Sequence, residues 1–259
     1  MPCAEVISIG TEILLGEIVD TNSHHILRVL RQEGVDVYRT TTVGDNLSRI
    51  QTAMQESLSR ADVVITTGGL GPTVDDLTRE AAARVMDVDL VFQEDLWQGI
   101  QGMLQDLKRE ITPNNKRQAY LPQGALPLNN MRGTAPAFVH DSQQGILVAL
   151  PGVPPEMKRL LKNEVLPWLR TRFDLSETIV TKSLGVEGIG ESKVDDLIAE
   201  FERFTNPTVG LAAHKGWVEI RITAKADTTP EAERIIKDVK DDLSDRLAPW
   251  LREDLPEGN

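Results

Sequence analysis

The sequence lacks the features that mark secreted, disulfide-bonded or membrane-spanning proteins. Its 259 residues contain one cysteine, Cys3, which excludes an intramolecular disulfide. No apolar run approaches the roughly 20 residues that a helix needs to cross a bilayer, so we expect no contact with a membrane core. The first residues show no basic stretch followed by an apolar one. We therefore expect no secretory signal and a cytoplasmic location.

Basic residues are scarce as well. The chain has 28 lysines and arginines against 40 aspartates and glutamates, and its formal net charge is -12. This charge would repel nucleic acids and anionic membrane surfaces at long range. Neither is expected as a partner, whereas a small anionic ligand is still allowed at a local site.

Apolar runs and helical periodicities alternate along the first part of the chain. Strands are predicted at 4–9, 35–43, 62–67 and 145–150, and helices at 22–33, 47–60 and 94–110, with a further helix from Pro154. Residues 112–124 are rich in turn formers and predict a loop-rich surface segment. The alternation indicates an α/β domain over residues 1–170, with a mostly parallel sheet and helices on both faces.

The pattern changes after residue 170. A strand at 178–184, a helix at 191–204, a hairpin turning at Lys215 and Gly216, and a helix at 230–247 are predicted. This β-α-β-β-α order indicates a separate small α+β domain over residues 171–250, and residues 251–259 are expected to form a tail.

The segment from Thr66 to Thr78, TTGGLGPTVDDLT, is the most informative in the chain. Its glycines follow a predicted strand and precede a helix, so a phosphate could approach backbone N–H groups there. Asp75 and Asp76 would repel a phosphate unless a divalent cation lies between them or one carboxylate takes part in the chemistry. The segment predicts a nucleotide-handling enzyme.

The same acids have structural alternatives. Thr73 and Asp76 fit the spacing of a capping box, and acids in a first helical turn stabilise the helix. Asp45 is placed to cap the helix that begins near Leu47. The residues alone leave these readings open.

Five motifs together resemble one family, the competence/damage-inducible protein A (CinA) family. In chain order they are Gly10 to Gly16 (GTEILLG), Asp20 to Ser23 (DTNS), Thr67 to Thr78, Gly133 to Pro136 (GTAP) and Leu150 to Pro154 (LPGVP). The resemblance covers nearly the whole chain. It implies an N-terminal domain of the molybdopterin-binding type, similar to the MogA and MoaB proteins, followed by a KH-like domain.

The resemblance also implies an activity, the hydrolysis of ADP-ribose to AMP and ribose 5-phosphate with a divalent metal ion of the Mg, Mn, Co or Ni class. It further implies a homodimer. Many members carry an additional C-terminal domain that deamidates nicotinamide mononucleotide, but this chain lacks the AES-x-TGG type of segment associated with that nucleophile. We therefore expect no deamidase activity from it.

The resemblance implies particular site residues. Asp76 matches the acid retained in the MogA-like motif and Asp75 a position that varies, while Asp45 matches an acidic position of the nucleotide site. We expect Asp76, Asp45 and Asp75 to be catalytic, with Asp76 and Asp75 as metal ligands. The expected substrate-binding residues are Gly10, Thr11, Glu12, Thr67, Gly68, Gly69, Leu70, Gly71, Pro72, Asn115, Lys116, Gly133, Thr134, Pro151 and Gly152.

Two positions depart from what the resemblance leads us to expect. Ala137 stands where we expect a glycine, and an alanine forced to positive φ would cost roughly 1 kcal/mol or more. The turn from Gly188 to Glu191 (GIGE) differs from the GxxG loop by which KH domains clamp RNA, so RNA binding is not expected. Two alternatives to the pyrophosphatase remain: pterin or flavin nucleotide chemistry, including adenylyl transfer, and a noncatalytic nucleotide-binding or interaction module.

Overall fold

The computed structural model describes residues 2–175 and 178–252. The chain divides into two compact units, and the first ends at Leu175. Residue 170, the expected boundary, lies inside helix α7 (Leu166–Phe173). Leu166 and Leu169 of this helix are buried in the core of the first unit, so the whole helix belongs to that unit.

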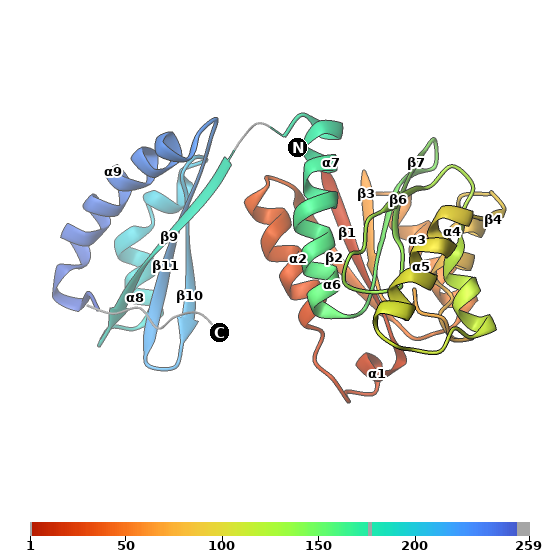
Figure 1. Cartoon of the computed structure of the whole chain (residues 1–259). Coiled ribbons are helices and arrows are strands. Elements are labelled where there is room, and N and C mark those ends of the chain that lie inside the picture. The colour runs from red at the N-terminus through yellow and green to blue at the C-terminus, as the bar shows by residue number, and fades with distance from the viewer. Residues whose placement is uncertain (1, 176–177, 253–259) are drawn as a thin grey trace. The chain divides into compact units, whose positions relative to one another are not determined.

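The first unit is built on a six-stranded sheet with the order β2-β1-β3-β8-β7-β6 (Figure 1). Four neighbouring strands pair in parallel, and β7 and β6 each pair antiparallel with the strand before them in this order. The sheet is therefore mostly parallel, as predicted. The strands are β1 (Cys3–Ile9), β2 (Asp36–Val43), β3 (Val63–Thr67), β6 (Leu126–Leu128), β7 (Ala137–Ser142) and β8 (Gly145–Leu150).

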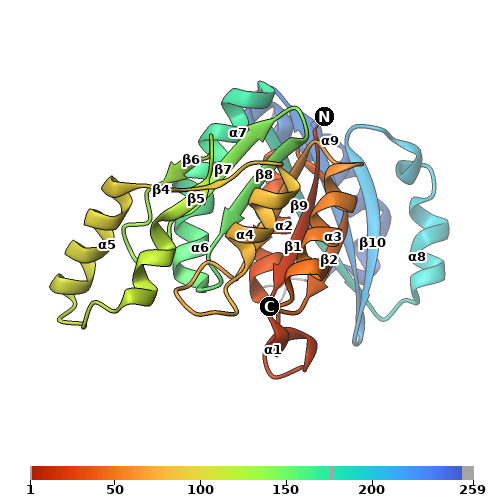
Figure 2. The same ribbon diagram turned by 90° about the vertical axis from the view of Figure 1, so that its right-hand side faces the viewer.

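Helices cover both faces of this sheet. Helices α2 (Thr21–Gln32), α6 (Pro154–Leu160) and α7 pack on one face. Helices α3 (Leu47–Leu58) and α4 (Thr78–Val85) pack on the other, side by side in Figure 2. Strand β1 serves both layers because its side chains alternate: Ala4 and Val6 join the first core, and Ile7 and Ile9 the second. A central parallel strand is thus apolar on both sides, which explains its uninterrupted apolar run.

Several predicted boundaries hold and others move. Helix α2 stops before Gly34, whose φ of 74° suits a helix end. The helix from Pro154 continues through a π-helical turn (Leu161–Val165) into α7. Helix α5 (Glu94–Asp106) ends four residues before the predicted limit of 110. A short sheet of β4 (Leu90–Phe92) and β5 (Tyr120–Pro122) completes the unit.

The prediction of a loop-rich surface segment at 112–124 is wrong in part. Pro113–Ala119 forms a 3-10 helix, and β5 follows it directly. The side chain of Asn115 accepts hydrogen bonds from the backbone N–H of Thr112 and from its hydroxyl, both at 2.9 Å. Turn-forming residues therefore cap a short helix here, with Asn115 and Gln118 buried.

The second unit has the predicted β-α-β-β-α order. Its sheet has the order β10-β11-β9 with antiparallel pairing throughout, and the apolar face of α9 packs against it through Ile236 and Leu243. Helix α8 ends at Ile198, before the predicted limit of 204, and a 3-10 turn (Phe201–Arg203) follows. The elements are β9 (Thr178–Glu187), α8 (Glu191–Ile198), β10 (Thr208–His214), β11 (Trp217–Ala226) and α9 (Thr229–Leu247).

The helices of residues 2–175 and 178–252 include none with the length and apolar character needed to cross a membrane.

A buried carboxylate ties strand β1 to the end of helix α3. Glu5 accepts hydrogen bonds from Arg60 Nε at 2.5 Å, Arg60 Nη2 at 2.9 Å and Ser57 Oγ at 2.7 Å. Burial raises the pKa of Glu5, but the hydrogen bonds from Arg60 and Ser57 outweigh it and hold the pKa below its ordinary value. The stability that this cluster contributes is therefore present above the unfolded pKa of about 4.3, and it is lost as the pH falls through the lower folded pKa.

We expect Glu5→Gln to lower the free energy of unfolding by about 2 kcal/mol near neutral pH, because the amide leaves Arg60 without its charge partner. Arg60 reaches solvent, which keeps the effect below that of a fully buried pair. Below the folded pKa the difference should shrink, since the wild-type carboxyl is then neutral too. Urea denaturation at several pH values measures this, with exposed Glu56→Gln as the control. An effect of Glu5→Gln that did not depend on pH would contradict the assignment.

Candidate functional site

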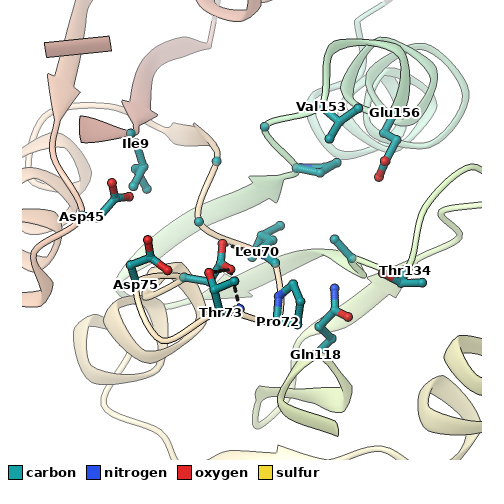
Figure 3. A pocket seen from close by; sticks show the side chains of 18 of the residues that line it. Ile9, Asp45, Leu70, Pro72, Thr73, Asp75, Gln118, Thr134, Val153 and Glu156 are labelled. Atoms are coloured by element: carbon teal, nitrogen blue, oxygen red, sulfur yellow. Dashed lines mark hydrogen bonds between the residues drawn. The ribbon is translucent and has the colours of Figure 1, made fainter. Parts of the chain in front are cut away.

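A pocket of about 410 Å³ opens at the carboxyl ends of the parallel strands (Figure 3). The loops after β1, β2, β3 and β8 all contribute to its wall, which is where ligands collect in open α/β sheets. Residues expected from the sequence to bind substrate or act in catalysis lie in all four loops. Predicted site residues that line the pocket are Gly10, Glu12, Asp45, Gly68, Gly69, Leu70, Gly71, Pro72, Asp75, Asp76, Thr134, Pro151 and Gly152.

Two glycines allow the loop after β3 to turn over the end of β1. Gly68 has a φ of 108° and Gly69 a φ of 65°, both in the region that side chains disfavour. A Cβ on Gly68 would strike the carbonyl oxygen of Ile9, and one on Gly69 would strike the hydroxyl of Thr78. Glycine is required at both positions for conformation and for space.

The loop uses part of its own hydrogen-bonding capacity. The N–H of Gly68 donates to the carbonyl of Leu150 at 3.0 Å, and the N–H of Gly71 donates to Asp76 Oδ1 at 2.8 Å. Among the described residues, the N–H groups of Gly69 and Leu70 have no acceptor. Of the four amides from Gly68 to Gly71 expected to hold a diphosphate, these two are free to do so.

Asp76 closes the loop on itself. Besides the bond from Gly71, its Oδ2 accepts hydrogen bonds from the N–H and the hydroxyl of Thr73, at 2.8 and 2.5 Å. The capping box considered from the sequence does not form, because α4 begins at Thr78 and its N-cap, Leu77, makes no side-chain cap. Asp76 thus lines the pocket as the residue that fixes the shape of the loop.

Asp75 is more open than its neighbour. Its side chain lines the pocket, and the nearby Thr73 hydroxyl holds the pKa of Asp75 below its ordinary value. The carboxylate is therefore ionised at neutral pH. An ionised, solvent-facing carboxylate has oxygen lone pairs to offer a cation.

Arg79, which the sequence analysis did not select, lies beneath the loop. Its guanidinium is fully buried and donates to the carbonyls of Leu70 at 2.6 Å and Gly71 at 2.8 Å. Burial lowers the pKa of Arg79. By holding these two carbonyls on the inner side, Arg79 fixes the peptide planes of the loop. No distinctive pattern marked it, because an arginine one residue inside a helix is ordinarily solvated.

Asp45 is fixed by the loop after β1. Its Oδ2 accepts a hydrogen bond from the N–H of Thr11 at 2.8 Å, and its own N–H donates to the Thr11 hydroxyl at 3.1 Å. Asp45 does not cap helix α3, because Asn46 does so by accepting from the N–H of Arg49 at 3.1 Å. Thr11 does not line the pocket, and it acts there only through Asp45.

The buried side-chain amide of Asn22 links the loops beneath the pocket. Asn22 Nδ2 donates to Thr67 Oγ1 at 3.0 Å and to the carbonyl of Gly152 at 2.8 Å. Thr67 donates in turn to the carbonyl of Pro151 at 3.1 Å. Thr67 is therefore a structural link between the loops after β3 and β8 and does not line the pocket. Asp20 caps α2 by accepting from the N–H of Ser23 at 2.9 Å.

The opposite wall carries a glutamate that the sequence analysis missed. Glu156, in the first turn of α6, lines the pocket and accepts a hydrogen bond from Asn130 Nδ2 on Oε2 at 2.7 Å. Gly133 lies against this carboxylate with no room for a Cβ, so it shapes the wall from behind. The signal for Glu156 was its place after the LPGVP motif, at the start of a helix that follows a strand.

Gln118 faces the pocket on the same side as Thr134 and Glu156 (Figure 3). It is 1% exposed, and its Oε1 has no hydrogen-bond partner among the described residues. A buried amide oxygen without a partner is costly, which points to a ligand as its partner. Asn115 and Lys116 lie elsewhere: Asn115 caps its own helix, and Lys116 Nζ lies 4.9 Å from the ring centre of Phe92.

Ala137 carries no strain. It begins strand β7, is fully buried and is not among the described residues with positive φ. The cost anticipated for an alanine here does not arise, because the position is extended.

The charge of the pocket is of one sign. Five carboxylates line it, and the lining contains no lysine, arginine or histidine. The part of the chain that the structure describes holds no group of three or more histidine, cysteine or acidic side chains arranged for a metal ion. Magnesium-type ions are often held by one or two carboxylates together with substrate phosphates. The residues present suit an ion bound in that shared way. The five carboxylates that line the pocket are those of Glu12, Asp45, Asp75, Asp76 and Glu156.

The chain matches two protein families. Residues 5–171 match the family described as a probable molybdopterin binding domain, and residues 181–251 match the damage-inducible protein CinA KH domain. A CinA-like protein of Kosmotoga olearia is 40% identical over 249 residues, covering 96% of this chain and 60% of the relative. A competence-damage inducible protein of Halothermothrix orenii is 42% identical over 248 residues, which again cover 96% of this chain and 60% of the relative. The chain thus spans 60% of the length of these curated relatives.

A solved structure is also similar. The crystal structure of CinA from Thermoplasma acidophilum is 34% identical, has a TM-score of 0.58, and covers 67% of this chain and 98% of its own. On this likeness and the two family matches, the chain belongs to the CinA family, in which a molybdopterin-binding-type α/β domain is followed by a KH-like domain.

Proposed function

We propose that this chain is a metal-dependent nucleotide pyrophosphatase that hydrolyses ADP-ribose to AMP and ribose 5-phosphate. The observation that carries the proposal is the composition of the pocket: free N–H groups of Gly69 and Leu70 beside five carboxylates and no basic side chain. A diphosphate would find donors there but no counter-charge. A divalent cation bound together with the diphosphate resolves this conflict.

Asp45 and Asp75 are the residues we assign to the cation. They lie on the same side of the pocket (Figure 3), and each has carboxylate oxygen capacity beyond its internal hydrogen bonds. Asp76 is committed to Gly71 and Thr73, so we assign it to the loop. When bound, the cation would neutralise charge on the diphosphate and lower the pKa of a bound water.

The chain's own groups would orient the substrate and move a proton. Gly69 and Leu70 donate to diphosphate oxygens, and Gln118 supplies a polar contact on the far wall. Glu156 accepts the Asn130 hydrogen bond on Oε2, which leaves Oε1 to take a proton from water. The water oxygen bonds to one phosphorus, the bridging P–O bond breaks, and the leaving phosphate keeps the electron pair.

A second candidate function is pterin nucleotide chemistry. It is favoured by the match to a molybdopterin binding domain over residues 5–171. The same amides and acids would serve an adenylyl transfer or the cleavage of a larger dinucleotide, so the two functions differ in substrate and not in the phosphate site.

The test is release of AMP from a panel of nucleoside diphosphate compounds with Mg²⁺, Mn²⁺, Co²⁺ or Ni²⁺. We expect ADP-ribose turnover that falls by at least about 100-fold on chelation of the metal. Asp45→Asn, purified in parallel, controls for contaminating hydrolases and should require far more metal. Faster turnover of a pterin or flavin dinucleotide would establish the second candidate. Tight ADP-ribose binding without turnover under any of the metals would show a noncatalytic binding module.

A further inference from the structure

A second pocket, of about 720 Å³, lies on the far side of the wall that carries Thr134. Helix α5 forms one side of it and residues 128–136 form the other. Its lining is mainly apolar, in contrast to the acidic pocket. Leu107 and Met131 are 53% and 61% exposed, so the chain itself leaves much of this apolar surface uncovered. The side chains that define its character are Leu96, Ile100, Met103, Leu107, Leu128 and Met131.

The two pockets are continuous along one segment. Thr134 lines both, and its neighbour Gly133 lines the apolar pocket while contacting Glu156 of the acidic one. Gln118, with its unpartnered Oε1, faces the acidic pocket on this same side (Figure 3). A ligand whose phosphates occupy the acidic pocket therefore has an apolar compartment and an unused amide next to it.

Two glycines enlarge the apolar compartment at a cost. Gly99 and Gly102 lie within helix α5 and line the pocket. Each glycine inside a helix costs about 1 kcal/mol relative to alanine. A Cβ built on either residue meets no atom within 4 Å, and neither has positive φ. Neither the packing nor the backbone of the described chain requires glycine there, and what the glycines provide is open space.

We propose that this pocket is the subsite for the flat heteroaromatic base of the nucleotide substrate. The proposal rests on the proposed function for the phosphate site. Leu96 and Ile100 on α5 and the sulfur atom of Met103 offer an apolar, polarisable surface of the kind that aromatic rings contact favourably. Asn129 at the rim has an amide that can pair with the edge of a base. The acidic pocket binds the diphosphate, and the apolar pocket selects compounds that carry a base.

Gly102→Leu tests this by filling the compartment from its helix wall. Isothermal titration with Mg²⁺ present would compare ADP-ribose, AMP and inorganic pyrophosphate in a Glu156→Gln background, which lacks the proton acceptor proposed for hydrolysis. We expect the Kd for ADP-ribose and for AMP to rise by at least about tenfold. Pyrophosphate, which has no base, should bind within about twofold of the Glu156→Gln parent. Gln105→Leu adds the same side chain on an exposed part of α5 outside the pocket, so it should bind all three ligands normally.

The outcomes separate this proposal from the function. Unchanged ADP-ribose binding by Gly102→Leu would overturn the subsite while turnover in the wild type still supported the pyrophosphatase. Equal weakening of pyrophosphate would also overturn it, because the substitution would then have disturbed the shared wall. If Gly102→Leu selectively lost binding of ADP-ribose and AMP while the wild type hydrolysed no ADP-ribose, the result would support the subsite and reject the pyrophosphatase.

Discussion

Asp76→Asn is expected to lower kcat for AMP release from ADP-ribose by about 100-fold, without unfolding the protein. The carboxylate accepts three hydrogen bonds from Gly71 and Thr73, whereas an amide places an N–H₂ group against one of these donors. The loop must shift, and the free amides of Gly69 and Leu70 shift with it. Initial-rate kinetics measure the effect, with circular dichroism as the check on folding.

Two measurements, pyrophosphate binding and the metal concentration for half-maximal rate, distinguish positioning of the loop by Asp76 from metal binding by Asp76. A residue that positions the loop should weaken pyrophosphate binding and leave the metal concentration for half-maximal rate unchanged. Asp45→Asn, at a position we assign to the cation, should raise that metal concentration instead. If Asp76→Asn changed only the metal requirement, Asp76 would be a metal ligand as first expected from the sequence. An unchanged rate would remove Asp76 from the site altogether.

Arg79→Ala is expected to lower the free energy of unfolding by about 3 to 5 kcal/mol. Arg79 is fully buried, so truncation leaves a cavity, and it removes both donors from the carbonyls of Leu70 and Gly71. Urea denaturation gives the total effect. Because the chain has two units, hydrogen exchange of peptides from β1 and β3 should follow the first unit separately.

Arg84→Ala is the matched control for this prediction. It removes the same side chain from the exposed end of the same helix and should change stability by no more than about 0.5 kcal/mol. If Arg79→Ala were as mild as Arg84→Ala, the guanidinium would contribute nothing to the loop. Arg79→Lys should recover only part of the loss, since one ammonium cannot match the planar fork that reaches both carbonyls.

Asp75 and Asp76 show which properties of the site can be predicted from the sequence. The motif from Thr66 to Thr78 placed Asp75 and Asp76 at one pocket, and both do line it. The motif could not show which of the two acids fixes the loop and which is open to a cation, because that depends on which carboxylate accepts the hydrogen bonds from Thr73. Helix α4 begins at Thr78, four residues later than the Val74 start that a capping box of Thr73 and Asp76 would need.

In residues 115–118 the sequence does not indicate which side chain faces the pocket. Asn115, Lys116 and Gln118 are close in sequence, yet of the three only Gln118 lines the pocket. The 3-10 helix buries Asn115 as its own cap and sends Lys116 toward the ring of Phe92. A local composition of turn formers predicts irregular structure but not which side chain faces inward, because that depends on the tertiary packing of the segment.

Side-chain periodicity in the sequence predicts the strand-helix alternation, the mostly parallel sheet and the β-α-β-β-α order of the second unit. Such periodicity is a local property of the chain. Only the tertiary structure brought Glu156 across the pocket from Asp45, buried Arg79 under the loop and opened an apolar compartment beside Thr134. Each of these joins residues that are distant in the chain or depends on how a helix packs, so neither spacing nor composition could specify it.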